Sequence, residues 1–198
     1  MTDWAALKKK RWKPTFRWTD EGEVMLHLIT GGSGSGKSAF AEQCILNLGE
    51  APRIYIATMY PFDEESRRRI ARHREMRREK RFTTIECFTG LSGVQVPSGA
   101  NVLLECLSNL TANELYRADG AGEKTKEAIL SGVQSLLEQA ASLIIVTNEI
   151  FSDEIVYDPE TVRYQKLLGS LNTELAKWAD RVTEVACGIP LSVKGGER

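Results

Sequence analysis

The chain has 198 residues, of which 42% are hydrophobic and 27% are charged, and its formal net charge at pH 7 is −1. Such a length suits one compact α/β domain, because domains usually hold about 100 to 200 residues. The composition is ordinary for a globular protein, and no apolar run is long enough to cross a bilayer. A membrane span is therefore excluded at the sequence level.

Residues 1–22 are predicted to form an extension that precedes a single domain of residues 23–198. The extension mixes basic residues with Trp4, Trp12, Phe16 and Trp18 and has no sustained helix or strand period. Such a segment can bind nucleic acid or an anionic surface. An arm that packs its aromatic rings on its own or a neighbouring subunit is the simpler explanation.

The four cysteines lack a CxxC spacing, and the basic N-terminus is not followed by an apolar run of signal-peptide length. We therefore expect a cytoplasmic protein. Cys44, Cys87, Cys106 and Cys187 each stand among apolar residues, which favours four buried thiols over a disulfide or a metal site.

The first predicted strand begins at Val24 and leads directly into a glycine-rich loop, Gly31-Gly32-Ser33-Gly34-Ser35-Gly36-Lys37-Ser38, which a helix over 38–48 follows. The loop fits the pattern GxxxxGK[ST]. Its glycines let backbone N–H groups turn towards phosphate oxygens, the lysine reaches the outer phosphates, and the last hydroxyl holds Mg²⁺. This order predicts nucleoside triphosphate binding, but it does not choose between an ATPase, a GTPase and a small-molecule kinase. His27, within the strand, is expected to be a packed core residue.

Further strands are expected over 53–57, 83–87, 102–104 and 143–146, with late strands over 181–186 and 189–193. Helices are expected from Asp63 towards Lys80 and over 108–116, 123–141 and 159–179. Strands that alternate with helices predict a mainly parallel, helix-covered sheet. The expected fold class is therefore α/β, of the P-loop nucleotide-binding type.

A magnesium-dependent P-loop enzyme also needs a carboxylate near the end of an apolar strand. Glu105 ends the strand over 102–104, and Glu149 follows the strand over 143–146. We favour Glu105 as the metal ligand beside Ser38 and keep Glu149 as the alternative. Either residue can instead be an exposed acid at the end of a strand.

The segment from Arg67 to Arg81 holds nine basic residues against two acidic ones, so it must face water or an anion. On a helix, Arg69, His73 and Arg77 share one face. The arginines disfavour protonation of His73, which leaves a neutral nitrogen that can attack phosphorus, and they can neutralise a triphosphate. A solvated basic helix with an incidental histidine explains the pattern equally well. Nucleic acid is the weaker interpretation, because no aromatic residue is interleaved.

Five segments occur in a familiar order: Leu-Ile-Thr-Gly-Gly-Ser-Gly-Ser-Gly-Lys-Ser (28–38), Tyr-Ile-Ala-Thr (55–58), Asp-Glu-Glu (63–65), Arg-Ile-Ala-Arg-His-Arg (69–74) and Val-Thr-Asn-Glu (146–149). In this order the chain resembles the bifunctional adenosylcobinamide kinase / adenosylcobinamide-phosphate guanylyltransferase family of cobalamin biosynthesis. The resemblance covers about residues 25–195. Its specificity comes from the combination, since only the phosphate loop is widely shared.

The resemblance implies two reactions: phosphorylation of adenosylcobinamide, then transfer of GMP from GTP to adenosylcobinamide phosphate through a GMP-histidine. It places the nucleophile at His73, makes Lys37 the second catalytic residue, and calls for GTP, ATP and Mg²⁺. The implied nucleotide contacts beyond the loop are Thr58, Met59, Tyr60, Arg74, Glu75, Met76, Arg77, Glu86 and Glu105. A homo-oligomer, a trimer in this family, is expected, with no nucleic-acid partner.

Three departures from the family pattern leave the loop and His73 untouched. Residues 150–157 replace a glycine-containing run, so the corrinoid-facing loop is expected to differ. Phe82 stands where tryptophan is common, and residues 1–22 exceed the usual family start. Two alternatives stay open: a P-loop kinase of another small alcohol, in which His73 only binds phosphate, and a nucleotide-dependent module that binds nucleic acid. The resemblance does not decide whether ATP or GTP is the phosphate donor.

Overall fold

The computed structural model describes residues 25–152 and 156–195, so the predicted extension lies outside the described residues. The described elements are, in chain order, β1 (Met25–Thr30), α2 (Lys37–Asn47), β2 (Arg53–Ala57), α3 (Glu64–Arg77), the 3₁₀ turn η1 (Arg78–Lys80), β3 (Phe82–Glu86), η2 (Leu91–Gly93), β4 (Asn101–Leu104), α4 (Leu107–Tyr116), η3 (Gly122–Lys124), α5 (Thr125–Gln139), β5 (Ser142–Val146), α6 (Pro159–Trp178), β6 (Arg181–Ala186) and β7 (Ile189–Lys194). The strand expected over 83–87 begins and ends one residue earlier, and the helix expected over 123–141 is η3 followed by α5.

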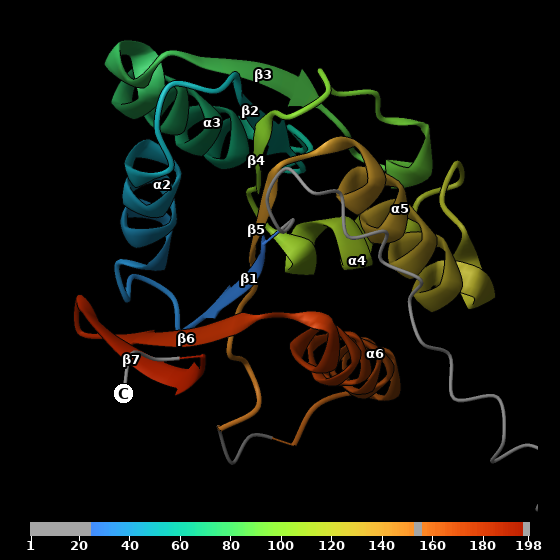
Figure 1. Cartoon of the computed structure of the whole chain (residues 1–198). Helices are drawn as coiled ribbons and strands as arrows, with labels where there is room; N and C mark the ends of the chain where they lie inside the picture. Colours follow the sequence, from blue (N-terminus) through green and yellow to red (C-terminus); the bar gives the residue numbers. More distant parts are fainter. Residues whose placement is uncertain (1–24, 153–155, 196–198) are drawn as a thin grey trace, which may run out of the picture.

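The seven strands form one sheet in the order β3-β2-β4-β5-β1-β6-β7. All neighbouring strands are parallel except β7, which runs antiparallel to β6 at the edge. Helices α2 and α3 cover one face, and α4, α5 and α6 cover the other (Figure 1). The prediction of a mainly parallel, helix-covered α/β sheet is confirmed. The carboxyl ends of six strands therefore meet at one edge, where ligands bind in folds of this kind.

Alternate residues of each strand enter two separate cores, because successive side chains of a strand point to opposite faces. In β2, Ile54 and Ile56 join the large core beneath α4, α5 and α6. Tyr55, between them, joins the smaller core with residues of α2 such as Ala41 and Ile45. The strand thus directs one large polar side chain to the face that α2 and α3 cover.

Helix α3 begins with a reciprocal cap. Asp63 accepts a hydrogen bond from the Ser66 backbone N–H at 2.7 Å, and the Ser66 hydroxyl accepts one from the Asp63 N–H at 3.0 Å. These bonds satisfy two of the free donors at the helix start, and they hold the pKa of the Asp63 carboxyl below its usual value. The acidic start predicted for this helix is confirmed, and its arginines follow the first turn.

His27 is a packed core residue, as predicted, with 4% of its surface exposed. Its Nε2 lies 2.8 Å from the Thr183 hydroxyl on β6. The expectation of four buried thiols is wrong for Cys187. All four cysteines are free, but only Cys87 is fully buried, and Cys187 is exposed. Cys187 occupies the turn between β6 and β7, where its φ is 52°. The apolar residues near it in the sequence lie in the two strands, whereas Cys187 itself faces solvent.

None of the helices within the described ranges is long and apolar enough to cross a membrane.

Candidate active site

The glycine-rich loop follows β1 at the carboxyl edge of the sheet and packs against the end of β6. Gly31 has a φ of 153°, and a Cβ there would lie 2.4 Å from the Val185 carbonyl oxygen. Gly36 has a φ of 92°, and its Cβ would lie 3.3 Å from the Cα of Gly188. Only glycine tolerates both the backbone conformation and the close approach at Gly31.

Two polar side chains of this loop are buried. Lys37 donates from Nζ to the Gly32 carbonyl oxygen at 3.0 Å, and burial lowers the pKa of its ammonium. The nearby Cys106 partly offsets this lowering of the pKa, and Arg69 of α3 adds to it. The Ser35 hydroxyl is buried with no hydrogen-bond partner among the described residues. A preformed loop with an unpaired hydroxyl and a desolvated ammonium is suited to phosphate oxygens.

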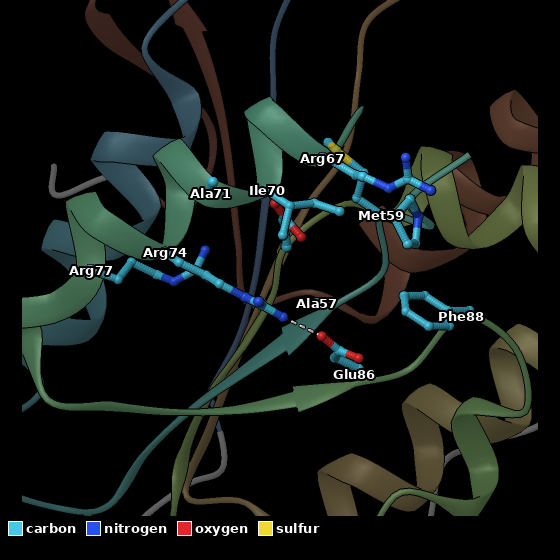
Figure 2. A pocket seen from close by; sticks show the side chains of 11 residues that line it. Ala57, Met59, Arg67, Ile70, Ala71, Arg74, Arg77, Glu86 and Phe88 are labelled. Carbon is cyan, nitrogen blue, oxygen red and sulfur yellow. Dashed lines mark hydrogen bonds and ion pairs between the residues drawn. The ribbon is translucent and has the colours of Figure 1, made fainter. Parts of the chain in front are cut away.

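A cavity of about 270 Å³ lies at the carboxyl ends of β2, β3 and β4, beneath α3 (Figure 2). Its lining combines cations, carboxylates and apolar groups: Ala57, Met59, Pro61, Arg67, Ile70, Ala71, Arg74, Arg77, Glu86, Phe88 and Glu105. The phosphate loop itself does not line this cavity, and β5 separates β1 from β4 in the sheet. The loop and the cavity nevertheless both lie at the carboxyl ends of strands of the same sheet.

Arg77 is the most deeply buried cation of α3, with 5% of its surface exposed. Its Cζ lies 3.3 Å from the centre of the Tyr55 ring. Its Nε and Nη1 are buried and have no hydrogen-bond partner among the described residues. A buried guanidinium with unpaired donors is costly alone and is well suited to an anion. Arg77 thus belongs to the cavity and not to a solvated basic face.

Arg74 and Glu86 form an ion pair across the cavity, from α3 to β3 (Figure 2). Both side chains are more than half exposed. Such a pair adds little to stability because water screens it. Its geometric consequence is clearer: it holds a cation and a carboxylate together at the mouth of the cavity.

The two candidate magnesium carboxylates differ in their surroundings. Glu105 lines the cavity, and its backbone N–H donates to the Ile56 carbonyl oxygen at 3.1 Å. The Glu149 carboxylate is used locally, since it accepts hydrogen bonds from the Phe151 N–H and the Ser152 hydroxyl, both at 2.8 Å. The geometry therefore favours Glu105.

Of the other predicted contacts, Met59 lines the cavity, whereas Thr58 is buried and is not among the lining residues. The Thr58 hydroxyl donates to the Cys106 carbonyl oxygen at 2.9 Å, which ties the end of β2 to the end of β4. Tyr60 packs edge-on against Phe88, with ring centroids 5.1 Å apart. Glu75 is exposed and pairs with Arg78 at 3.3 Å, so it is not brought to the cavity. His73 and Met76 belong to α3, and their side chains lie outside the described residues.

The cavity also contains residues that the sequence did not single out, above all Arg67, Ile70 and Phe88. Arg67, Ile70, Arg74 and Arg77 recur at helical spacings of three or four, so one face of α3 lines the cavity. This periodicity was available in the sequence. Phe88 follows β3 after a bend and carried no such signal.

A resident magnesium ion would find few protein ligands here. The described ranges contain no group of three or more His, Cys, Asp or Glu side chains that could hold a metal. Magnesium in phosphate-transfer sites takes one or two protein oxygens and completes its shell with substrate phosphates and water. Ser38, at the end of the loop, and Glu105, at the end of β4, fit that requirement.

Comparison with known proteins shows the family of the chain. Residues 27–193 match the model of a protein family described as cobinamide kinase / cobinamide phosphate guanyltransferase. The bifunctional adenosylcobalamin biosynthesis protein CobU of Salmonella typhimurium is 31% identical over 186 residues, which cover 86% of this chain and 100% of that protein. The bifunctional adenosylcobalamin biosynthesis protein CobP of Pseudomonas aeruginosa is 34% identical over 179 residues, with 86% and 98% covered. Among solved structures, the KaiC-like protein PH0186 of Pyrococcus horikoshii has a TM-score of 0.47 at 18% identity, covering 82% of this chain and 72% of its own.

Proposed function

Because the chain belongs to the cobinamide kinase / cobinamide phosphate guanyltransferase family, we propose that it phosphorylates adenosylcobinamide and then transfers GMP from GTP to adenosylcobinamide phosphate. As a member of this family the chain is a transferase. One observation carries the proposal. Arg77 of α3, one helical turn beyond His73, is buried at the cavity and has two nitrogens without a hydrogen-bond partner among the described residues. A buried cation with unpaired donors suits a nucleotide phosphate, which would then lie beside the part of α3 that bears the histidine.

In the first reaction, the aminopropanol hydroxyl oxygen of adenosylcobinamide attacks the γ-phosphorus of ATP or GTP. The hydroxyl proton is lost, the bond from the γ-phosphorus to the bridging oxygen breaks, and a nucleoside diphosphate leaves. Lys37 and the loop N–H groups from Gly31 to Ser38 would bind the outer phosphates. They stabilise the charge that develops on the leaving oxygens.

In the second reaction, a ring nitrogen of His73 attacks the α-phosphorus of GTP. An N–P bond forms, the bond to the β-phosphate breaks, and pyrophosphate leaves. A phosphate oxygen of adenosylcobinamide phosphate then attacks the same phosphorus and releases the histidine. Splitting one exchange into two steps lowers each barrier, and a neutral nitrogen is both the nucleophile and the leaving group.

The remaining residues are assigned to nucleotide binding. Arg77 and Arg74 supply positive charge in the cavity, and Glu86, Met59 and the segment from Thr58 to Tyr60 surround the guanosine. Magnesium, held by Ser38 and Glu105, would neutralise phosphate charge. Glu75 and Met76 complete the set that the family pattern assigns. A cytoplasmic homotrimer that does not bind nucleic acid belongs to the same proposal, and light scattering of the purified chain tests its oligomeric state.

The proposal is tested by incubating the protein with Mg²⁺ and GTP labelled in the α-phosphate. We expect an acid-labile protein adduct in the wild type and none in His73→Ala. GTP labelled in the γ-phosphate should leave no label on the protein, because the γ-phosphate departs with pyrophosphate.

A matched control exists because the chain has two histidines. His27 is buried and bonded to Thr183, so His27→Gln should form the adduct at the wild-type level. An adduct that survives in His73→Ala, or that is lost in a folded His27→Gln variant, would contradict the assignment to His73.

A further inference from the structure

Tyr55 connects two groups that line the cavity. It is the central residue of β2, and 2% of its surface is exposed. The sheet alternation directs it away from the large core and towards α3. A tyrosine at such a position needs a partner for its hydroxyl, since burying an unpaired polar group is costly.

The guanidinium of Arg77 lies over the ring of Tyr55. The Arg77 Cζ lies 3.3 Å from the ring centre, at a distance where a cation and an aromatic face attract each other. Phe82 of β3 also packs edge-on against the Tyr55 ring, with centroids 5.9 Å apart. The ring therefore sets where Arg77 presents its two unpaired buried nitrogens, Nε and Nη1.

The hydroxyl of Tyr55 lies near the Glu105 side chain, at the end of β4. Burial and the nearby Glu105 carboxylate raise the pKa of Tyr55. The contact that the geometry fixes is the one between the ring and Arg77.

We propose that Tyr55 is a positioning residue of the nucleotide site, whose ring holds Arg77 in place for a nucleotide phosphate. The proposal rests on the proposed function in that it assigns the cavity to GTP. Tyr55 is buried beneath Arg77, so its effect on GTP binding must pass through that side chain.

The ring contact is tested by equilibrium binding of GTP to the full chain in EDTA. Tyr55→Leu should raise the Kd about 10-fold, because the guanidinium loses its aromatic support. In an Arg77→Met background the same substitution should change the Kd by less than about 2-fold, since residues that act through one another are not additive. An equal effect in both backgrounds would overturn the proposal.

Tyr55→Phe keeps the ring and is the matched control for the ring contact. Its Kd for GTP in EDTA should stay within about 2-fold of the wild type, because the aromatic face under Arg77 is retained. A rise as large as that of Tyr55→Leu would contradict the role of the ring.

Tyr164→Phe is a second control, because Tyr164 is also partly buried and donates from its hydroxyl, to the Ser108 carbonyl oxygen at 3.1 Å. It should leave the Kd for GTP within about 2-fold of the wild type. GTP binding is measured without turnover. A chain that bound GTP but formed no adduct would therefore refute guanylyl transfer, and the role of Tyr55 could still be tested. If Tyr55→Leu does not fold, Arg77→Met decides, and a Kd within about 2-fold of the wild type would overturn the proposal.

Discussion

The backbone N–H of Glu149 donates a hydrogen bond to the carbonyl oxygen of Gly31, 3.0 Å away. The end of β5 is thereby tied to the first residue of the phosphate loop through the main chain. The Glu149 carboxylate turns to Phe151 and Ser152, whereas Glu105 lines the cavity. The two residues thus differ in role: the backbone of Glu149 supports the phosphate loop, and the side chain of Glu105 lines the cavity.

Glu105→Gln should lower turnover in both reactions by about 10- to 100-fold, because a neutral amide binds magnesium poorly. Glu149→Gln should stay within about 3-fold of the wild type, since the N–H to Gly31 remains and an amide oxygen still accepts. Steady-state rates at several magnesium concentrations measure both effects. If Glu149→Gln lost more turnover than Glu105→Gln, Glu149 and not Glu105 would be the metal ligand.

Gly31→Ala should unfold at lower urea concentration than the wild type. The new Cβ would meet the Val185 carbonyl oxygen at 2.4 Å, and the φ of 153° is poorly tolerated by alanine. We expect a loss of about 2 to 4 kcal/mol in the free energy of unfolding, together with loss of GTP binding. Gly32→Ala is the control. A Cβ there meets no atom of the described residues within 4 Å, and its unfolding should change by less than about 0.5 kcal/mol. Equal stability of the two variants would show that the loop does not pack as described.

Lys80→Met should destabilise the fold by about 2 to 4 kcal/mol, because it leaves the carboxylate of Glu42 buried without its partner. Lys80 pairs with Glu42, whose side chain is 3% exposed, and the pair joins η1 to α2. The double variant Glu42→Leu with Lys80→Met should recover most of the loss, since an apolar pair of similar size needs no counter-charge. Urea unfolding of the three proteins tests this, and a double variant as unstable as Lys80→Met would refute it.

His27 should make the fold less stable in mild acid. Burial, with a smaller contribution from Arg181, lowers its pKa from 6.5 to about 4. Between these values the unfolded chain binds a proton that the folded chain does not, so stability is full above pH 6.5 and falls as the pH falls. From about pH 7 to about pH 5 the wild type should lose about 2 kcal/mol more than His27→Gln. If the free energy of unfolding changed equally with pH in the wild type and in His27→Gln, His27 would not be the cause of the acid sensitivity.

The local sequence predicted most of the architecture, because hydrophobic periodicity and the glycine loop act over short distances. Residues 53–57 and 181–186 are strands with the expected bounds. Cys187 was placed in the core because its neighbours are apolar, yet a turn with a φ of 52° turns it to solvent. Turn geometry of this kind depends on the pairing of β6 with β7, which composition does not reveal.

The site could be predicted only in part. The choice between Glu105 and Glu149 needed the cavity that Glu105 lines, which forms only when β2, β3, β4 and α3 pack together. The basic segment was expected to face water or an anion, and Arg77 lines a cavity with two unpaired donors that suit an anion. Its place over Tyr55, 22 residues earlier in the chain, could not be predicted, because it depends on the pairing of β2 with β3 that brings α3 across the sheet. The spacing of Arg67, Ile70, Arg74 and Arg77 was the local sign of an inward face.

The most direct test of guanylyl transfer is a single-turnover chase. Protein labelled from α-phosphate-labelled GTP is separated from free nucleotide and mixed with adenosylcobinamide phosphate. Label should leave the protein at the rate at which it enters a corrinoid product that carries GMP, and His73 should then accept label again. Label that stays on the protein, or that leaves only as free GMP, would contradict transfer through His73.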